Sequence, residues 1–166
     1  MSTADDYAAF AELVTEYVAW SRTRYAEDVW FVDKVFGYQS LASELKTLSS
    51  TYGPPNGKTL LISRDGRTCG GGAYRRLADG SCEMKRVFVR REFSGAGIGR
   101  RLCNALIQSA RDDGYTLMRL DTGNLLTEAI ALYKSIGFTE CACYSEYPQE
   151  LMPYLIFMQL PLRGGA

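Results

Sequence analysis

The sequence predicts one α/β domain built on a mixed, mostly antiparallel sheet, and three observations lead to this fold class. The chain has 166 residues, enough to bury a proper core, and neither a linker nor an internal repeat divides it. Three β-prone segments joined by turn signals occupy residues 59–90, which indicates an antiparallel meander. An amphipathic helical pattern between the last of these segments and a further strand indicates a βαβ crossover.

The N-terminal part is predicted to be helical. Apolar side chains recur at helical spacing in residues 5–20, and a second helix is predicted for residues 40–48. The run Tyr-Gly-Pro-Pro-Asn-Gly at 52–57 then makes a loop, while residues 22–36 carry no clear pattern. The candidates for capping the first helix are Ser2, Thr3 and Asp5.

The predicted meander has three strands, at residues 59–64, 68–77 and 81–90. The first strand is apolar and β-prone, and the second alternates around three consecutive glycines. The pair Asp65-Gly66 is a strong hairpin signal, and a second turn of sequence Ala-Asp-Gly precedes the third strand. These turns are short enough to make consecutive strands antiparallel neighbours.

The C-terminal half alternates helices and strands. Residues 99–113 are predicted as a helix, residues 115–121 as a strand and residues 126–135 as a shorter helix. A glycine follows each helix, as expected at a C-terminal stop. Two more strands are predicted at residues 138–144 and 155–160, with prolines interrupting the chain between them.

Composition excludes several classes of function. The formal net charge is zero, so no general electrostatic attraction to nucleic acid or membrane is expected. No histidine is present, which removes the usual general base and the commonest zinc ligand, and no metal site is expected. Five cysteines without a C-x-x-C pair indicate reduced thiols in a cytoplasmic protein rather than a disulfide framework. No signal peptide and no membrane span are expected.

The chain is organised around a glycine cluster, Gly95, Gly97 and Gly99, between the third strand and the following helix. A strand, a glycine turn and a helix together present backbone N–H groups at a helix N-terminus, where phosphate binds well. The P-loop pattern G-x-x-x-x-G-K-[ST] does not occur. The dinucleotide pattern G-x-G-x-x-G fails in both registers, because its third glycine would fall at Arg100 or Leu102.

Residues 82–99 resemble motif A of the GCN5-related N-acetyltransferases, the GNAT superfamily, in which an apolar strand leads into [QR]-x-x-G-x-[GA]. The run Leu-Tyr-Lys-Ser-Ile-Gly-Phe at 132–138 resembles motif B, L-Y-x-x-x-G-F. The two motifs occur in the family's order, and the resemblance covers roughly residues 55–160. It implies a GNAT fold over residues 1–166, with helices on both faces of the sheet, in a small bacterial member.

The resemblance further implies that acetyl-CoA is the co-substrate. Its pyrophosphate would meet the glycine turn, and its pantetheine arm would pair with the edge of the third strand. Ser94 stands where the family usually has Gln or Arg, so Arg91, Arg100 or Arg101 would supply the charge. Leu126 replaces a frequent asparagine. The residues implied to bind acetyl-CoA are Val87, Phe88, Val89, Ser94, Gly95, Ala96, Gly97, Ile98, Gly99, Arg100 and, as a substitute for the missing asparagine, Asn124.

Catalysis without histidine must use other groups. Glu83 resembles the family's base position, either as the base itself, through water, or as an anchor for the substrate ammonium. Asp121 is the alternative carboxylate. The motif-B tyrosine, Tyr133, is the expected acid for the leaving thiolate. An acyl-enzyme on Cys82 or Cys103 is disfavoured because no histidine can activate the thiol.

Two functions remain open from the sequence. The first is an acetyl-CoA-dependent N-acetyltransferase that moves an acetyl group to a primary amine of a small molecule or peptide by direct attack on the thioester. The second is a non-catalytic acyl-CoA-binding sensor or regulatory module. The acceptor would lie between the N-terminal helices and residues 144–154, both rich in aromatics, of which Tyr7, Tyr17 and Trp20 are expected in the core. No nucleic-acid or membrane partner is expected, and family habit suggests a homodimer.

Overall fold

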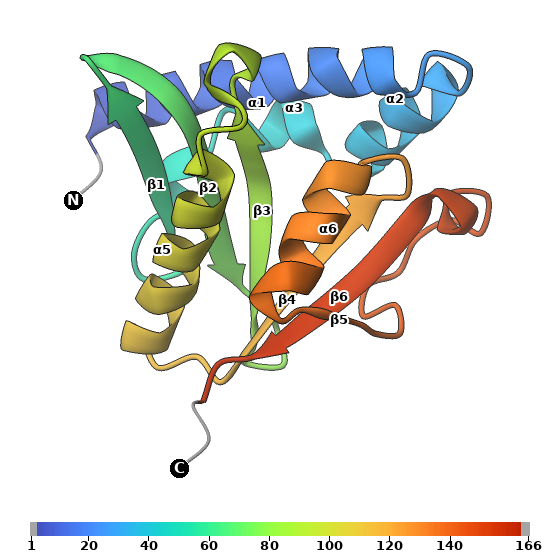
Figure 1. The fold of residues 1–166 in the computed structure, drawn as a ribbon. Helices are drawn as coiled ribbons and strands as arrows, with labels where there is room; N and C mark the ends of the chain where they lie inside the picture. Colours follow the sequence, from blue (N-terminus) through green and yellow to red (C-terminus); the bar gives the residue numbers. More distant parts are fainter. Residues whose placement is uncertain (1–2, 164–166) are drawn as a thin grey trace.

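The computed structural model describes residues 3–163. Within these residues six strands form one mixed sheet in the order β1-β2-β3-β4-β6-β5 (Figure 1). Only the β3–β4 pair is parallel among the described strand pairs. The prediction of an α/β fold with a mixed, mostly antiparallel sheet is therefore confirmed. The strands are β1 (Gly57–Arg64), β2 (Arg67–Arg76), β3 (Cys82–Val89), β4 (Leu117–Gly123), β5 (Thr139–Glu140) and β6 (Leu155–Pro161).

Helices cover both faces of this sheet. The two helices α5 and α6 lie in front of it in Figure 1, and their apolar sides pack on inward-facing residues of β3, β4 and β6 such as Met84, Met118 and Met158. The N-terminal helices pack on the other face, where Phe10 and Tyr52 meet Ala73 of β2. The helices are α1 (Ala4–Arg24), α2 (Val29–Tyr38), α3 (Leu41–Glu44), α4 (Leu48–Tyr52), α5 (Ile98–Asp112) and α6 (Thr127–Ile136).

The N-terminal segments differ from their prediction in length. Thr3 caps α1 through a capping box with Asp6, which leaves Asp5 inside the helix, and the proposed cap Ser2 lies outside the described residues. The segment at residues 22–36, which carried no clear pattern, includes most of α2, which ends at Tyr38. The single helix predicted for residues 40–48 is wrong: a short α3 ends at Glu44 and α4 begins at Leu48. The buried side chain of Glu44 is fixed by Arg86 of β3, which holds this break against the sheet.

The strand predicted for residues 138–144 is also wrong in extent. It ends after Glu140, because the chain then leaves the edge of β6. Beyond it, Tyr144 and Tyr147 turn inward and pack against Phe157 of β6. This irregular segment brings a tyrosine hydroxyl to the middle of the sheet, where the polar residues described below gather.

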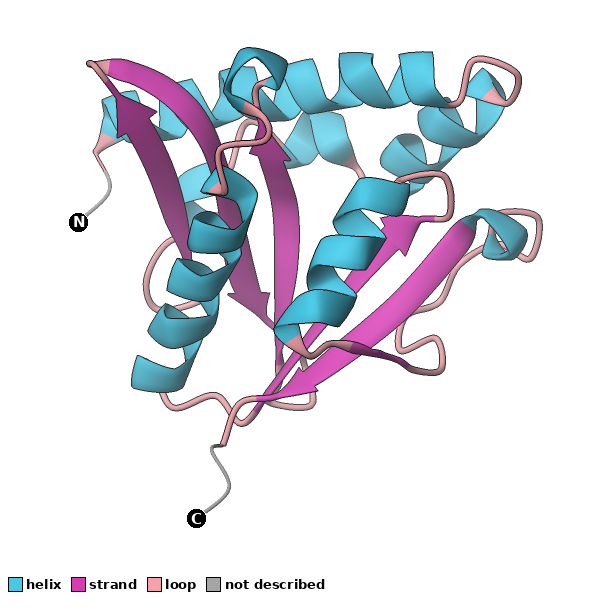
Figure 2. Ribbon diagram, viewed as in Figure 1, coloured by secondary structure: helices cyan, strands magenta, loops and turns pink. Residues whose placement is uncertain are grey.

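The central strands β3 and β4 separate soon after they meet. Their parallel pairing covers only Cys82 with Met118 and Glu83 with Arg119. Figure 2 shows the two strands diverging from this point, with α6 in front of the opening. Beyond the divergence β3 remains paired to β2 on its other side, so the edge of β3 that faces β4 has no strand partner within the described chain. This opening positions the functional site.

Candidate acetyl-CoA and acceptor site

A groove of about 840 Å³ runs between the diverging strands and under the glycine turn. Its walls come from α1, the end of β3, the start of α5, β4 and α6. Tyr133 and Leu132 of α6 lie along one side, and Tyr17 and Trp20 of α1 lie along the other. Concave sites of this size with mixed apolar and polar walls suit an extended small molecule.

The turn at the head of the groove is built for a close backbone approach. Gly95 and Gly97 have φ angles of +82° and +73°, in the left-handed region that favours glycine. A Cβ added at either position would meet no atom within 4 Å, so the space above the turn is open. Gly97 is the N-cap of α5 and offers no side chain to its free N–H groups. These N–H groups and the helix dipole make an anion site.

Positive charge beside the turn comes from arginines. Arg91 and Arg100 line the groove, whereas Arg101 does not. Arg100 donates a hydrogen bond to Ser135 of α6, which fixes its guanidinium across the gap between the two helices. Ser94 also lines the groove, but its hydroxyl donates to the carbonyl oxygen of Arg91. Arg91 and Arg100 are therefore the cations available to a pyrophosphate, and Ser94 shapes the turn.

The free edge of β3 forms the floor of the groove. Val87, Phe88 and Val89 all line it. The N–H of Arg90 donates to the carbonyl of Cys69, so Arg90 occupies a hydrogen-bonded position opposite β2. Such positions alternate along an antiparallel pair, so the N–H and C=O of the preceding residue, Val89, point away from β2 and toward the opening. An amide-bearing ligand lying in the groove would find these groups available. The sheet thus offers a strand-like docking edge.

Most of the residues implied to bind acetyl-CoA meet in this groove. Ala96 and Asn124 are the two that do not line it. The side-chain oxygen of Asn124 accepts a hydrogen bond from Tyr25, which ties the β4–α6 loop to the end of α1. The predicted residues that line the groove are Val87, Phe88, Val89, Ser94, Gly95, Gly97, Ile98, Gly99, Arg100 and Tyr133.

Tyr133 is held in the groove wall with its proton in place. Burial raises the pKa of its hydroxyl well above the ordinary value, and the nearby charge of Asp121 adds to this effect. Its ring packs edge-on against Phe138 of the core. The side chain is therefore a buried, protonated tyrosine in the wall of the groove, and protonated is the state that a proton donor requires.

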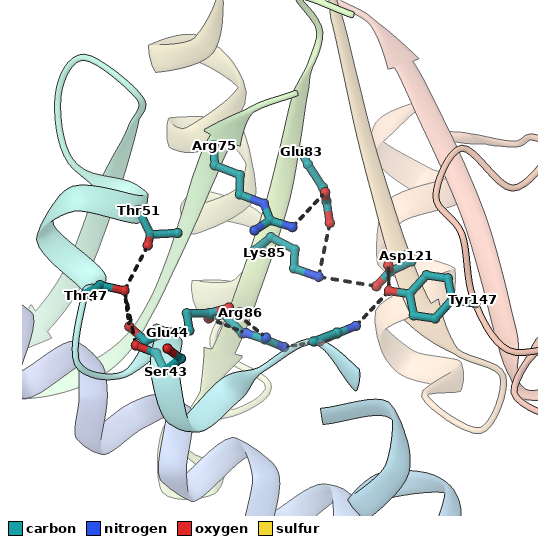
Figure 3. A network of polar contacts seen from close by, with 11 residues as sticks. Ser43, Glu44, Thr47, Thr51, Arg75, Glu83, Lys85, Arg86, Asp121 and Tyr147 are labelled. Atoms are coloured by element: carbon teal, nitrogen blue, oxygen red, sulfur yellow. Dashed lines mark hydrogen bonds and ion pairs between the residues drawn. The ribbon is translucent and has the colours of Figure 1, made fainter. Parts of the chain in front are cut away.

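Glu83 lies deeper than the sequence suggested. Its side chain is 2% exposed, it lines no wall of the groove, and both carboxylate oxygens form ion pairs. One oxygen is 3.1 Å from the Lys85 ammonium, and the other is 3.5 Å from the Arg75 guanidinium. Lys85 in turn lies 3.8 Å from Asp121. Lys85 thus joins the two carboxylates considered as the base (Figure 3).

This polar network extends to the N-terminal helices. The Tyr147 hydroxyl donates to Asp121 at 2.6 Å and accepts from the Gln39 side-chain amide at 2.8 Å. Gln39 also accepts from Arg86, whose guanidinium forms a two-pronged pair with Glu44 (Figure 3). Arg86 has a φ of +58°, a strained conformation for a non-glycine residue, at the bulge in β3. The Glu44 pair compensates by fixing this side chain.

A second, smaller cavity of about 50 Å³ adjoins the groove. The two share Tyr17, Thr122 and Leu126 as lining residues. Asp121 and Arg86 supply its charged walls. Apolar side chains from the end of α1 and from α2 supply much of the remainder, namely Tyr25, Phe31, Val32, Val35 and Phe36. The cavity lies beside the N-terminal helices, one of the two sides expected for the acceptor, but no residue of the other side, 144–154, lines it.

Several lining residues escaped the sequence analysis. Tyr7, Tyr17 and Trp20 were expected in the core, and all three are partly buried and pack against buried clusters. Tyr17 and Trp20 also line the groove and contact Phe88 of β3, which was not expected. Thr122 was not singled out at all. The aromatic residues at helical spacing in α1 are the sequence signal that could have identified Tyr17 and Trp20. They would have had to be considered together with the edge of β3, which was already expected to bind a ligand.

These features coincide with one known family. Residues 10–138 match the model of the Acetyltransferase (GNAT) family, so the chain belongs to this family and is an N-acetyltransferase that uses acetyl-CoA. An N-acetyltransferase of Schizosaccharomyces pombe, itself uncharacterised, is 37% identical over 128 residues, covering 75% of this chain and 76% of that protein.

Solved structures share the fold. A GNAT acetyltransferase of Staphylococcus aureus superposes with a TM-score of 0.70 at 17% identity, over 93% of this chain and 94% of that one. A GNAT acetyltransferase of Elizabethkingia anophelis with acetyl-CoA bound gives a TM-score of 0.54 at 21% identity, over 64% of this chain and 76% of that one. Both confirm the fold predicted from the two motifs.

Residues 3–163 contain neither a cluster of metal-ligating side chains nor a membrane-spanning helix. No group of three or more His, Cys, Asp or Glu side chains in that range is arranged to hold a metal ion. No helix in the same range is both long enough and apolar enough to cross a bilayer.

Proposed function

We propose that this enzyme transfers the acetyl group of acetyl-CoA to a primary amine of a small molecule or peptide, by direct attack of the amine on the thioester. The observation that carries this proposal is the junction of the groove with the smaller cavity. The cavity presents a carboxylate, Asp121, to a group entering from the acceptor side. A cationic amine is the acceptor that such a wall attracts.

Acetyl-CoA fits the groove. The open turn at Gly95 and Gly97 and the cations Arg91 and Arg100 suit its pyrophosphate, and the free edge at Val89 suits its pantetheine amides. When bound, it supplies an activated acetyl group. The residues of the chain then hold the amine, accept its proton and supply a proton to the departing sulfur. Tyr133 is the proposed proton donor, and the proposed base is one of the two carboxylates bridged by Lys85, Glu83 or Asp121.

Direct transfer is supported by the state of the cysteines. Burial raises the pKa of Cys82 and of Cys103 to about 12, so both thiols are protonated and poorly nucleophilic at neutral pH. Cys82 donates a hydrogen bond to the carbonyl of Leu117 within the sheet. Neither cysteine lines the groove. An acyl-enzyme route would need one of these thiols to become an exposed thiolate.

The test is release of free thiol from acetyl-CoA with a panel of amines. The panel contains unbranched primary alkylamines from propylamine to hexylamine, 2-phenylethylamine, α-branched amines and a peptide with a free N-terminus. We expect turnover with at least one primary amine and the same kinetics in a Cys82→Ala variant. Tight acetyl-CoA binding without turnover on any of these amines would refute this acceptor class and favour the sensor function.

A further inference from the structure

Of the two carboxylates bridged by Lys85, only Asp121 reaches a cavity. Asp121 lines the smaller cavity, and its neighbour Thr122 lines both that cavity and the groove. Glu83 lines neither, and each of its carboxylate oxygens is already engaged by a cation. An amine that approaches from the acceptor side therefore meets Asp121 first.

The charges around the two carboxylates also differ. Glu83 has the Lys85 ammonium at 3.1 Å and the Arg75 guanidinium at 3.5 Å. Asp121 has the Lys85 ammonium at the longer distance of 3.8 Å and a hydrogen bond from Tyr147, while Arg86, the cation that shares the cavity wall, is already paired with Glu44. The negative charge of Asp121 is thus the less neutralised one. An incoming ammonium would find more attraction there than at Glu83.

Asp121 also lies within electrostatic reach of the residues that line the groove. Burial is the main reason why the pKa values of Tyr133 and Tyr17 are raised, and the charge of Asp121 contributes to both. Both tyrosines line the groove. The carboxylate lines the cavity and the proposed acid Tyr133 lines the adjoining groove, and Thr122, next to Asp121 in the chain, lines both.

We infer that Asp121 is the residue that binds and deprotonates the acceptor ammonium, that Tyr147 positions its carboxylate, and that the acceptor presents an unbranched primary amine. This inference rests on the proposed function. The cavity of about 50 Å³ has room for little more than an aminomethyl group, which favours an unbranched acceptor. The body of the acceptor then lies outside the cavity.

The chemical step balances with these residues. An ammonium N–H bond breaks and the proton passes to an Asp121 oxygen, which frees the nitrogen lone pair. The nitrogen forms a bond to the acetyl carbon and loses a second proton to water, the carbon–sulfur bond breaks, and the sulfur takes the hydroxyl proton of Tyr133. Asp121 then releases its proton and Tyr133 regains one from solvent. The net products are the amide, the free thiol and one proton.

The first experiment measures binding, so that it does not depend on turnover. The complex of the enzyme with CoA is titrated calorimetrically with hexylamine and with hexanol, which differ in charge at one end. We expect the wild type to bind the amine at least about tenfold more tightly than the alcohol. Asp121→Asn should remove this preference while leaving CoA affinity within about twofold. Asp121→Glu, which keeps the charge, should retain the preference.

The second experiment measures turnover of the best primary amine of the panel. Asp121→Asn should lower kcat/KM about 100-fold or more, the usual contribution of a general base. Glu83→Gln should lower it less than about tenfold. Tyr147→Phe should lower kcat/KM by about fivefold to tenfold without changing CoA affinity, as expected of a positioning residue rather than of a lost fold.

The outcomes separate this inference from the proposed function. If an amine is turned over but Asp121→Asn keeps activity within threefold, or Glu83→Gln alone abolishes it, the assignment of Asp121 is wrong. If no amine is turned over, the proposed function fails, and the amine–alcohol preference still decides the assignment. A preference that survives in Asp121→Asn overturns it. Circular dichroism of each variant establishes that it is folded.

Discussion

Tyr133 keeps its proton because its surroundings disfavour the phenolate. Its pKa is raised by burial, so the hydroxyl stays protonated beyond the ordinary tyrosine pKa of about 10. Tyr133→Phe should therefore lower kcat about 100-fold while acetyl-CoA affinity changes less than about threefold. In the wild type, no loss of kcat from Tyr133 ionisation is expected as pH rises to 10. Tyr115→Phe is the control, because Tyr115 is also a tyrosine of raised pKa but lies outside the groove.

A second prediction for a single residue compares Gly97 with Gly80. Gly97 and Gly80 have φ angles of +73° and +85°, and an added Cβ meets no atom within 4 Å at either site. Gly97→Ala and Gly80→Ala should each destabilise the fold by a similar amount, about 1 kcal/mol. Only Gly97→Ala should weaken acetyl-CoA binding, by about tenfold or more, because its methyl group lies over the phosphate cradle. Equal affinity of the two variants would move the pyrophosphate elsewhere.

Among the elements, α3 depends on one buried ion pair. Burial alone would raise the pKa of Glu44, but the hydrogen bonds and charge of Arg86 outweigh burial and hold it below its ordinary value. A lowered folded-state pKa contributes stability above the unfolded value, about 4.3, and this stability is lost as pH falls through the folded-state pKa. Glu44→Gln should cost about 3 kcal/mol near neutral pH, and less in acid.

Chemical denaturation at pH 7 and at pH 3 measures this difference. Glu140→Gln is the control, because its pair with Lys134 is more than half exposed on both sides. Exposed pairs of this kind contribute less than about 1 kcal/mol. An effect of Glu44→Gln as small as that of the control would mean that solvent reaches the Arg86 guanidinium.

The elements that the sequence predicted well are those with local signals. The meander was readable because turn residues such as Asp65-Gly66 lie between β-prone runs, and α5 because a glycine turn precedes a strong amphipathic stripe. The break between α3 and α4 was not, because it depends on the pairing of Glu44 with Arg86, far away in sequence. The strand that contains β5 was predicted too long for a similar reason: apolar residues continue past Glu140, but Tyr144 and Tyr147 pack inward against Phe157.

The residues of the candidate site also divide into those with local sequence signals and those that depend on contacts between distant segments. The proposed acetyl-CoA groove is lined by residues of contiguous motifs, so eleven of its lining residues, Arg91 included, could be named from sequence. The buried network did not follow, because Glu83, Lys85, Asp121 and Tyr147 come from three separate segments whose register only the fold sets.

At the scale of the whole molecule, acetyl-CoA should connect two halves of the sheet. The Val89 N–H points into the opening and has no hydrogen-bond acceptor among residues 3–163, whereas Phe88 is in register with Gly71 of β2 at a hydrogen-bonded position. Saturating acetyl-CoA should slow amide hydrogen exchange at Val89 by about tenfold or more and change Phe88 much less. Unchanged exchange at Val89 would exclude strand-like docking of the ligand.

The two residue pairs that join β3 to β4 also bear on how the chain folds. The meander β1–β2–β3 closes through short turns, so its ordering entails little loss of chain entropy. The pairing of β3 with β4 forms few hydrogen bonds, and the whole of α5 lies between the two strands in the sequence. Its formation therefore relies on Leu106 of α5 and Tyr133 of α6 packing over Met84 and Met118. Two half-sheets that form separately and then dock through these helices would leave the catalytic cleft as the last part of the molecule to assemble.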